Sequence, residues 1–178
     1  MERQLFDDRD FCKQITSGDT DDFDEWYRAS APRLHLFLKH LLGNEQAAED
    51  VMQETYIQIW RRPQGFDPER GTLRAYLFGT ARNLAISWKR KQRSTDELNH
   101  EPRVSDCVET NSMLSEALDR LDIDEQTILW LREVEGQSYS ELSASLNIPI
   151  GTVRSRLYAA REALRSVWHN TQRNGRPQ

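Results

Sequence analysis

The sequence has few of the features that mark exported or membrane proteins. It contains only two cysteines in 178 residues, Cys12 and Cys107, and they lie far apart. No apolar run approaches the roughly 18 residues that a membrane span needs. The N-terminus shows no basic start followed by an apolar stretch. We therefore expect reduced thiols rather than a disulfide, in a cytoplasmic protein.

Signatures of catalysis are also missing. No Gly-rich phosphate loop or nucleophile motif occurs. The histidines are scattered without the spacing of metal ligands: they are His35, His40, His100 and His169. We therefore expect no catalytic residue, no metal and no cofactor, and an enzyme is the rival interpretation from a different class.

The net charge of −5 conceals two basic segments in an acidic chain. Residues 61–93 carry 9 basic and 2 acidic side chains, and residues 150–178 carry 6 and 1. Clustered cations release counterions where they meet phosphates, so this pattern indicates two contacts with a polyanion. Two solvated helix faces are the plainer alternative.

Almost the whole chain has helical periodicity, which predicts an all-α protein. A short amphipathic turn around Phe11 and Ile15 is followed by a helix that ends at 43–44, another over 45–62 and a fourth over 72–93. Residues 63–71 are rich in helix breakers and predict a loop. Residues 94–111 have no periodicity, and their five acidic residues against one basic predict a flexible linker. We thus expect two small helical domains, 1–93 and 112–170, with a disordered tail at 171–178.

The second domain has the pattern of a helix-turn-helix. Ser138 and Glu141 form a capping box at the start of one short helix, and Asn147 suits the left-handed turn that ends it. Pro149 favours the first turn of the next helix. The pattern predicts a cap at Asp122 at the start of the preceding helix, which carries apolar residues at Ile128, Leu131 and Val134.

The last helix has a buried stripe opposite a basic face. The stripe contains Val153, Leu157, Ala160 and Leu164. The opposite face contains Arg154, Ser155, Tyr158, Arg161 and Arg165. Arginines beside a hydroxyl and an aromatic suit the major groove, although a solvated basic helix remains the alternative. Arg156 lies off this face and is given a phosphate or structural role.

The 72–93 helix places large apolar groups among cations on a face that we expect to be exposed. That face contains Phe78, Arg82, Ile86, Lys89 and Arg90, with Asn83 at its edge. Such a face suits single-stranded nucleic acid, where bases stack and cations hold the backbone. Phe66, in the preceding loop, is a second candidate for holding an unstacked base. The alternative is that Phe78 and Ile86 pack under another helix.

The 45–62 helix carries a second unusual face. It contains Asp50, Gln53, Glu54 and Ile57, opposite a predicted buried stripe of Ala48, Val51, Met52, Thr55 and Ile59. This face could bind a partner helix or could be an ordinary wet surface.

Taken together, four segments resemble the extracytoplasmic-function sigma factors of bacterial RNA polymerase. The segment AEDVMQETY at 48–56, followed by Trp60, is similar to their polymerase-binding helix. The segment FDPERGTLRAYL at 66–77, running into ARN at 81–83, resembles their promoter-melting segment. The segments EGQSYSEL at 135–142 and IPIGTVRSRL at 148–157 resemble their −35-reading domain.

The resemblance implies a first domain that grips the clamp coiled coil of core RNA polymerase and captures flipped bases of the −10 element. It implies a second domain that binds the duplex −35 element and the polymerase flap, and it implies an anti-sigma partner. Three positions depart from the family pattern: Ser87, Asp122 and Ala159. The main alternative is a one-component helix-turn-helix regulator that binds operator DNA without polymerase.

Overall fold

The computed structural model describes residues 21–99 and 117–174, and every regular element in these two ranges is helical. Contacts within the chain divide it into two compact units, Met1–Val104 and Ser105–Gln178. The predicted all-α, two-domain architecture is therefore confirmed. No helix in the described ranges has the length and apolar character needed to cross a membrane.

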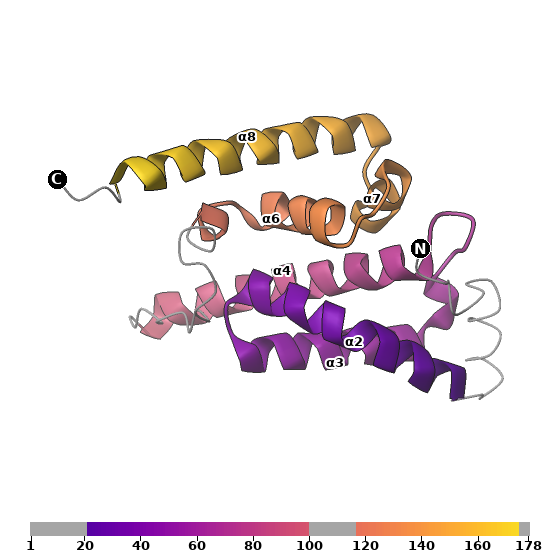
Figure 1. Ribbon diagram of the computed structural model, residues 1–178. Coiled ribbons are helices and arrows are strands. Elements are labelled where there is room, and N and C mark those ends of the chain that lie inside the picture. Colours follow the sequence, from indigo (N-terminus) through magenta and orange to yellow (C-terminus); the bar gives the residue numbers. More distant parts are fainter. Residues whose placement is uncertain (1–20, 100–116, 175–178) are drawn as a thin grey trace. The chain divides into compact units, whose positions relative to one another are not determined.

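The first unit is built from three long helices, α2 (Asp21–Leu42), α3 (Glu45–Arg61) and α4 (Leu73–Asn99). Each packs against the other two, and they lie alongside one another in Figure 1. A short 3₁₀ turn, η1 (Pro63–Gly65), follows α3. The predicted break after α2 is confirmed: Gly43 has a φ of 62°, and the Asn44 side chain accepts a hydrogen bond from the Ala47 amide at 2.8 Å.

The core of this unit includes most of the stripe predicted on α3. Ala48, Val51, Thr55 and Ile59 are buried, whereas Met52 is only half-buried. Tyr56 was not predicted to be buried, yet its ring packs edge-on against Trp26 at a centroid distance of 5.2 Å. Burial raises the pKa of Tyr56, and a hydrogen bond to Ser30 at 2.8 Å opposes that rise. Aromatic packing thus joins the start of α2 to the end of α3.

The fourth helix continues beyond its predicted end. Helix α4 extends to Asn99, so the prediction that the linker begins at 94 is wrong for residues 94–99. Ser94 to Asn99 contain no glycine or proline, and without a breaker the helix propagates into a polar sequence. The remaining predicted linker lies outside the described residues, as do the turn around Phe11 and Ile15 and both cysteines.

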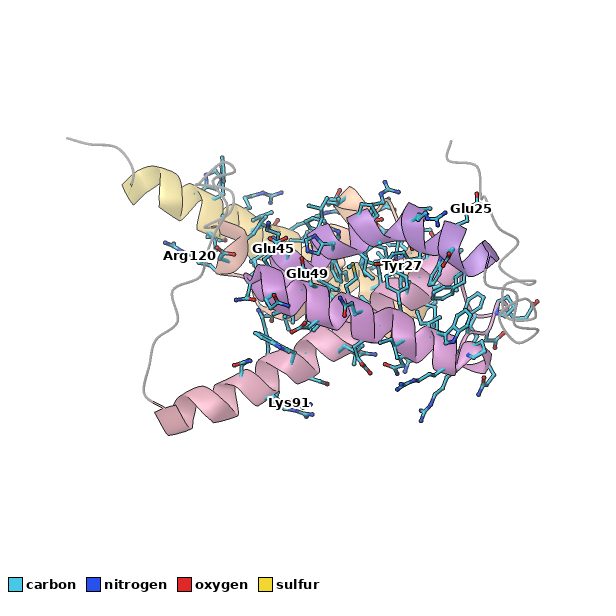
Figure 2. All side chains as sticks on the ribbon, turned by 90° about the horizontal axis from the view of Figure 1, so that it is seen from below. Glu25, Tyr27, Glu45, Glu49, Lys91 and Arg120 are labelled. Atoms are coloured by element: carbon cyan, nitrogen blue, oxygen red, sulfur yellow. The ribbon has the colours of Figure 1, made fainter. Side chains whose placement is uncertain are left out.

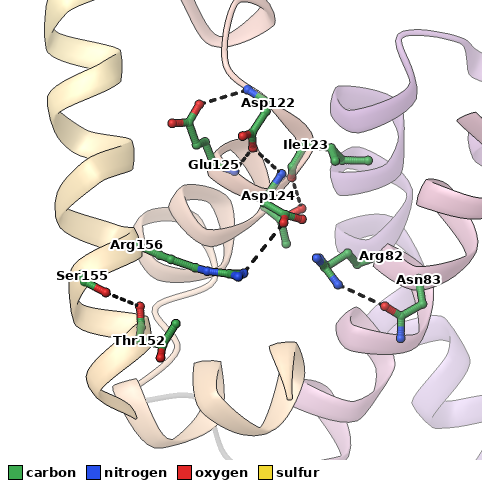
Figure 3. A network of polar contacts seen from close by, with 10 residues as sticks. Arg82, Asn83, Asp122, Ile123, Asp124, Glu125, Thr152, Ser155 and Arg156 are labelled. Atoms are coloured by element: carbon green, nitrogen blue, oxygen red, sulfur yellow. Dashed lines mark hydrogen bonds and ion pairs between the residues drawn. The ribbon is translucent and has the colours of Figure 1, made fainter. Parts of the chain in front are cut away.

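The second unit contains α6 (Ile123–Leu129), a π-helical segment η2 (Trp130–Val134), α7 (Tyr139–Leu146) and α8 (Ile150–Asn174). The predicted cap at Asp122 is confirmed, because its carboxylate accepts from the amides of Asp124 and Glu125 (Figure 3). The Glu125 side chain accepts in return from the Asp122 amide at 3.1 Å. The departure at Asp122 therefore supplies a helix start.

Two predictions in this unit need correction. Val134 is 54% exposed rather than apolar core, because the π segment changes the helical phase at this point. Helix α8 runs to Asn174, so residues 171–174 are helical rather than part of a disordered tail. Ahead of α6, Leu118 is half-buried and Leu121 is buried.

Candidate nucleic-acid and polymerase interfaces

The helix-turn-helix is held together by local hydrogen bonds at each end of α7. Ser138 Oγ accepts from the Glu141 amide at 3.2 Å, and the Glu141 carboxylate accepts from the Ser138 amide at 2.8 Å. Asn147 ends the helix in the left-handed conformation, with φ 53° and ψ 47°. Both sequence predictions are confirmed. The Ser143 hydroxyl then donates to the Ile148 carbonyl at 2.6 Å, which fixes the turn that leads into α8.

Helix α8 separates an apolar side from a basic side, as predicted. Val153, Leu157 and Ala160 are buried, while Leu164 is half-buried. The predicted −35 set is exposed throughout: Arg154, Ser155, Tyr158, Arg161 and Arg165. Tyr158 is 69% exposed. The exposed Tyr158 ring, which lies among arginines, has no packing role within the described part of this unit. The basic face of α8 is therefore available to a ligand.

The arginines near this face differ in their partners. Arg161 donates from Nε and Nη2 to one Glu133 oxygen, at 3.1 and 2.6 Å. Arg165 pairs with Glu162 one turn earlier on the same helix. Arg156, placed off the face by the sequence, lies 3.8 Å from the Asp124 carboxylate and links α8 to α6 (Figure 3). Of the two roles predicted for Arg156, phosphate contact or structural support, this ion pair supports the structural one.

Two residues beside the basic face were missed by sequence reasoning. The ring of Tyr139 lies 5.2 Å from the Arg132 guanidinium and 5.9 Å from that of Arg154, measured to the ring centroid. Arg132 also donates to the Gln137 carbonyl at 2.7 Å. The available signal was Arg132 itself, one of only three basic residues in the acidic 94–149 segment.

The polar members of the predicted −10 set lie together on α4. Arg82 Nη1 donates to Asn83 Oδ1 at 3.1 Å, and Asn83 is exposed (Figure 3). Arg90 is exposed, and Lys89 is half-buried. These cations therefore share a solvent-accessible side of the helix, although each keeps contacts within the protein.

The aromatic members of the −10 set are placed differently from the prediction. Phe78 is 1% exposed and packs edge-on against Phe37, with the ring centroids 5.2 Å apart. The prediction of an exposed Phe78 is wrong, because α4 contacts both α2 and α3 and so buries a wide arc of its surface. Phe66 is also buried, at 5% exposure, against the ring of Tyr76. Ile86 is half-buried, which agrees with packing under a neighbouring helix.

The predicted polymerase-binding face lies outward on α3. Asp50, Gln53 and Glu54 are exposed, Ile57 is 41% exposed and Trp60 is 36% exposed. Trp60 meets the ring of Phe23 edge-on at 4.8 Å, which fixes the indole from one side. Acidic groups around a fixed aromatic and an isoleucine offer both charge and apolar area to a partner.

The structure brings together one polar group that sequence spacing did not reveal. Ligand-type atoms of His35, Glu45 and Glu49 all lie within 4.8 Å of one another. Glu45 and Glu49 are one turn apart on α3 (Figure 2). The ammonium of Lys39 pairs with Glu45 and holds the pKa of that carboxyl below its usual range. A lysine already compensates this charge, so the group is an ionic link between α2 and α3.

Comparison with known protein families gives a separate match for each of the two units. The model for Sigma-70 region 2 matches residues 26–95, and the model for Sigma-70, region 4 matches residues 112–164. The ECF RNA polymerase sigma factor SigL of Mycobacterium tuberculosis is 32% identical over 150 residues, covering 78% of this chain and 84% of the relative. SigE of Mycolicibacterium smegmatis is 30% identical over 80% of this chain, which spans 60% of that longer relative.

A solved structure gives the same result. The sigma factor RpoE of Bartonella quintana, in complex with the anti-sigma factor NepR, superposes with a TM-score of 0.71 at 27% identity. The match covers 82% of this chain and 96% of that one. The structure has a helix-turn-helix that presents arginines and a basic helix α4. Together with the identity and coverage of these relatives, this shows that the chain belongs to the ECF RNA polymerase sigma factors.

Proposed function

We propose that this sigma factor binds core RNA polymerase through α3 and directs it to promoters, reading the −10 element with the first unit and the −35 element with the second. The observation that carries the proposal is the exposed face of α8, with its arginines and Tyr158 opposite a buried apolar stripe. Binding to core polymerase and promoter DNA agrees with membership of the family. A sigma factor works where the chromosome is, which supports the cytoplasm as its location.

Duplex recognition is assigned to Arg154, Ser155 and Tyr158, with Arg161 and Arg165 further along the helix. The first three lie near the start of α8, the end of a recognition helix that enters the major groove. Arginine can bind guanine with two hydrogen bonds, and the cations further along can neutralise phosphates.

Capture of the −10 strand is assigned to Arg82, Asn83, Lys89 and Arg90 on α4. The exposed Asn83 amide can pair with the edge of an unstacked base, while the cations bind its backbone. Phe66 belongs to this proposal only if its ring leaves the contact with Tyr76 when DNA binds. Phe78 supports the helix from inside rather than touching DNA.

An anti-sigma protein is a further proposed partner. The similar structure from Bartonella quintana is a complex of a sigma factor with an anti-sigma factor. An anti-sigma factor would act by covering surfaces that polymerase or promoter DNA also needs, and the α3 face with Trp60 and Ile57 is one such surface.

The test is transcription by purified core polymerase with this protein on a library of randomised promoters, with the start regions of the transcripts sequenced. We expect two enriched elements, near −10 and −35, that are absent with core alone. A parallel reaction with the Arg154→Ala variant should keep the −10 element and weaken the −35 element. Enrichment of a single operator-like sequence bound without core would favour the one-component regulator instead.

A further inference from the structure

Two arginines of the second unit meet at one tyrosine. Tyr139 is the first residue of α7, and its ring faces the guanidiniums of Arg132 at 5.2 Å and Arg154 at 5.9 Å. Arg161, further along α8, is bonded to Glu133 instead, and this hydrogen bond raises its pKa. Elements η2, α7 and α8 therefore contribute to one cluster of cations around an aromatic ring.

The tyrosine is itself held in place, so it can fix what touches it. Its backbone lies directly after the Ser138 cap, within the reciprocal capping box with Glu141. On one side the Arg132 guanidinium is anchored by the Gln137 carbonyl at 2.7 Å. The Tyr139 side chain is 36% exposed, so it is not part of the hydrophobic core of the described unit.

We propose that Tyr139 is a positioning residue for −35 recognition, which holds Arg154 through its ring. The proposal rests on the proposed function of α8. A long arginine side chain loses rotational freedom when it binds a base, and a ring that already restricts it reduces that loss.

The size of the effect follows from contacts of this kind. An exposed cation–π contact contributes about 0.5–1 kcal/mol, which corresponds to roughly a two- to fivefold change in affinity. Removing the ring should therefore weaken −35 binding less than removing Arg154 itself. The loss should appear mainly at the bases that Arg154 reads, because phosphate contacts elsewhere on the face remain.

The experiment uses holoenzyme assembled from core polymerase and the full chain, and measures its affinity for promoters carrying each single-base change in the −35 element. Tyr139→Leu removes the ring, and Tyr139→Phe keeps the ring but removes the hydroxyl. We expect Tyr139→Leu to lose about two- to fivefold in affinity and to relax preference at the same bases as Arg154→Ala. Tyr139→Phe should retain preference at those bases.

A double-mutant cycle separates positioning from direct contact. If Tyr139 acts through Arg154, Tyr139→Leu should have little further effect on preference at those bases in an Arg154→Ala background. Full additivity of the two losses, or an equal loss of preference in Tyr139→Phe, would overturn the proposal, because Tyr139 would then act on DNA by itself. A uniform loss at all −35 sequences would also overturn it, since that is the result of a destabilised domain.

The wild-type and Arg154→Ala proteins serve as references for the function itself. If wild-type holoenzyme shows no −35 preference, the proposed function of α8 fails. If wild type shows a preference that Arg154→Ala loses and Tyr139→Leu keeps, only the role of Tyr139 fails.

Discussion

Single arginines on α8 differ in how strongly the free protein restrains them. Arg161 makes two hydrogen bonds to Glu133, and Arg165 pairs within its own helix. Arg154 has the Tyr139 ring beside it. Arg154 therefore keeps its hydrogen-bond donors available for a base, whereas the other two must exchange a carboxylate for a phosphate. This difference makes Arg154 the best candidate for reading sequence.

We expect Arg154→Ala to weaken closed-complex formation by roughly 1–3 kcal/mol and to relax preference at one or two −35 positions. Gel shifts of holoenzyme on closed promoter complexes measure the affinity, and permanganate footprinting measures opening. Arg156→Ala is the matched control, because Arg156 pairs with Asp124 and lies off the face. An Arg154→Ala protein that is defective only in opening would contradict the assignment.

Phe78 provides the opposite case, a residue predicted to touch DNA that lies in the core. We expect Phe78→Ala to lower the free energy of unfolding by about 3–5 kcal/mol, because it leaves a cavity against Phe37. Urea unfolding followed by circular dichroism measures this loss. Phe78→Leu should recover much of the stability and should open promoters normally. Defective opening in a stable Phe78→Leu protein would return Phe78 to the DNA-binding set.

At the scale of elements, the sequence predicted best what depends on a few neighbouring residues. The capping box of Ser138 and Glu141, the left-handed Asn147 and the cap at Asp122 are each set by side chains within three residues of the backbone they bind. Such features need no knowledge of the rest of the chain. The order of helices and the helix-turn-helix could therefore be predicted.

Features that depend on distant parts of the chain could not be predicted in this way. The side of α4 that carries Phe78 is buried because a second helix packs on it, and periodicity alone cannot show how many neighbours a helix has. The contact of Tyr139 with Arg132 and Arg154 joins three elements. Its parts are separated in sequence by a turn and a helix, so no local spacing predicts it.

The outward face of α3 can be tested as an element. We expect Asp50→Lys combined with Glu54→Lys to abolish binding to core polymerase, because it reverses the charge of the face while leaving the buried stripe intact. Size-exclusion chromatography with purified core measures assembly, and circular dichroism checks folding. The matched control places the same charge change on α2, as Asp24→Lys with Glu25→Lys. A folded Asp50/Glu54 variant that assembles with wild-type affinity would show that polymerase binds elsewhere.

For the whole molecule, the distribution of charge limits what the protein can do alone. The basic segments at 61–93 and 150–178 are set in a chain of net charge −5. Counterion release scales with the number of phosphates neutralised, and each basic segment is small.

We therefore expect the free protein to bind promoter duplex weakly, with little preference for promoter over unrelated sequence. Fluorescence anisotropy at several salt concentrations, with and without core polymerase, measures both affinity and its salt dependence. Tight and sequence-specific binding by the protein alone would contradict this expectation and favour a one-component regulator.

The π segment η2 has a consequence for how much the length of this protein can vary. Its hydrogen bonds join each residue to the fifth one after it, as from the Glu135 amide to the Trp130 carbonyl at 3.0 Å, so the segment holds one residue more than an α-helix of the same extent. Deleting the exposed Val134 would let an ordinary α-helix form, but would rotate Arg132 and Glu133 by about 100° relative to α7 and α8.

Loss of that single codon should therefore leave a folded domain in which Arg161 no longer pairs with Glu133 and Tyr139 no longer faces Arg132. Nuclear magnetic resonance of the arginine Nε–H groups would detect the loss of the Arg161–Glu133 pair. The protected Arg161 signal should disappear while the helical content of the protein stays native. An unchanged Arg161 signal would mean that the Arg161–Glu133 pair does not depend on the extra residue in η2. Insertion or deletion of one residue in η2 is then a mutation that changes promoter preference while the sequence of the recognition helix stays the same.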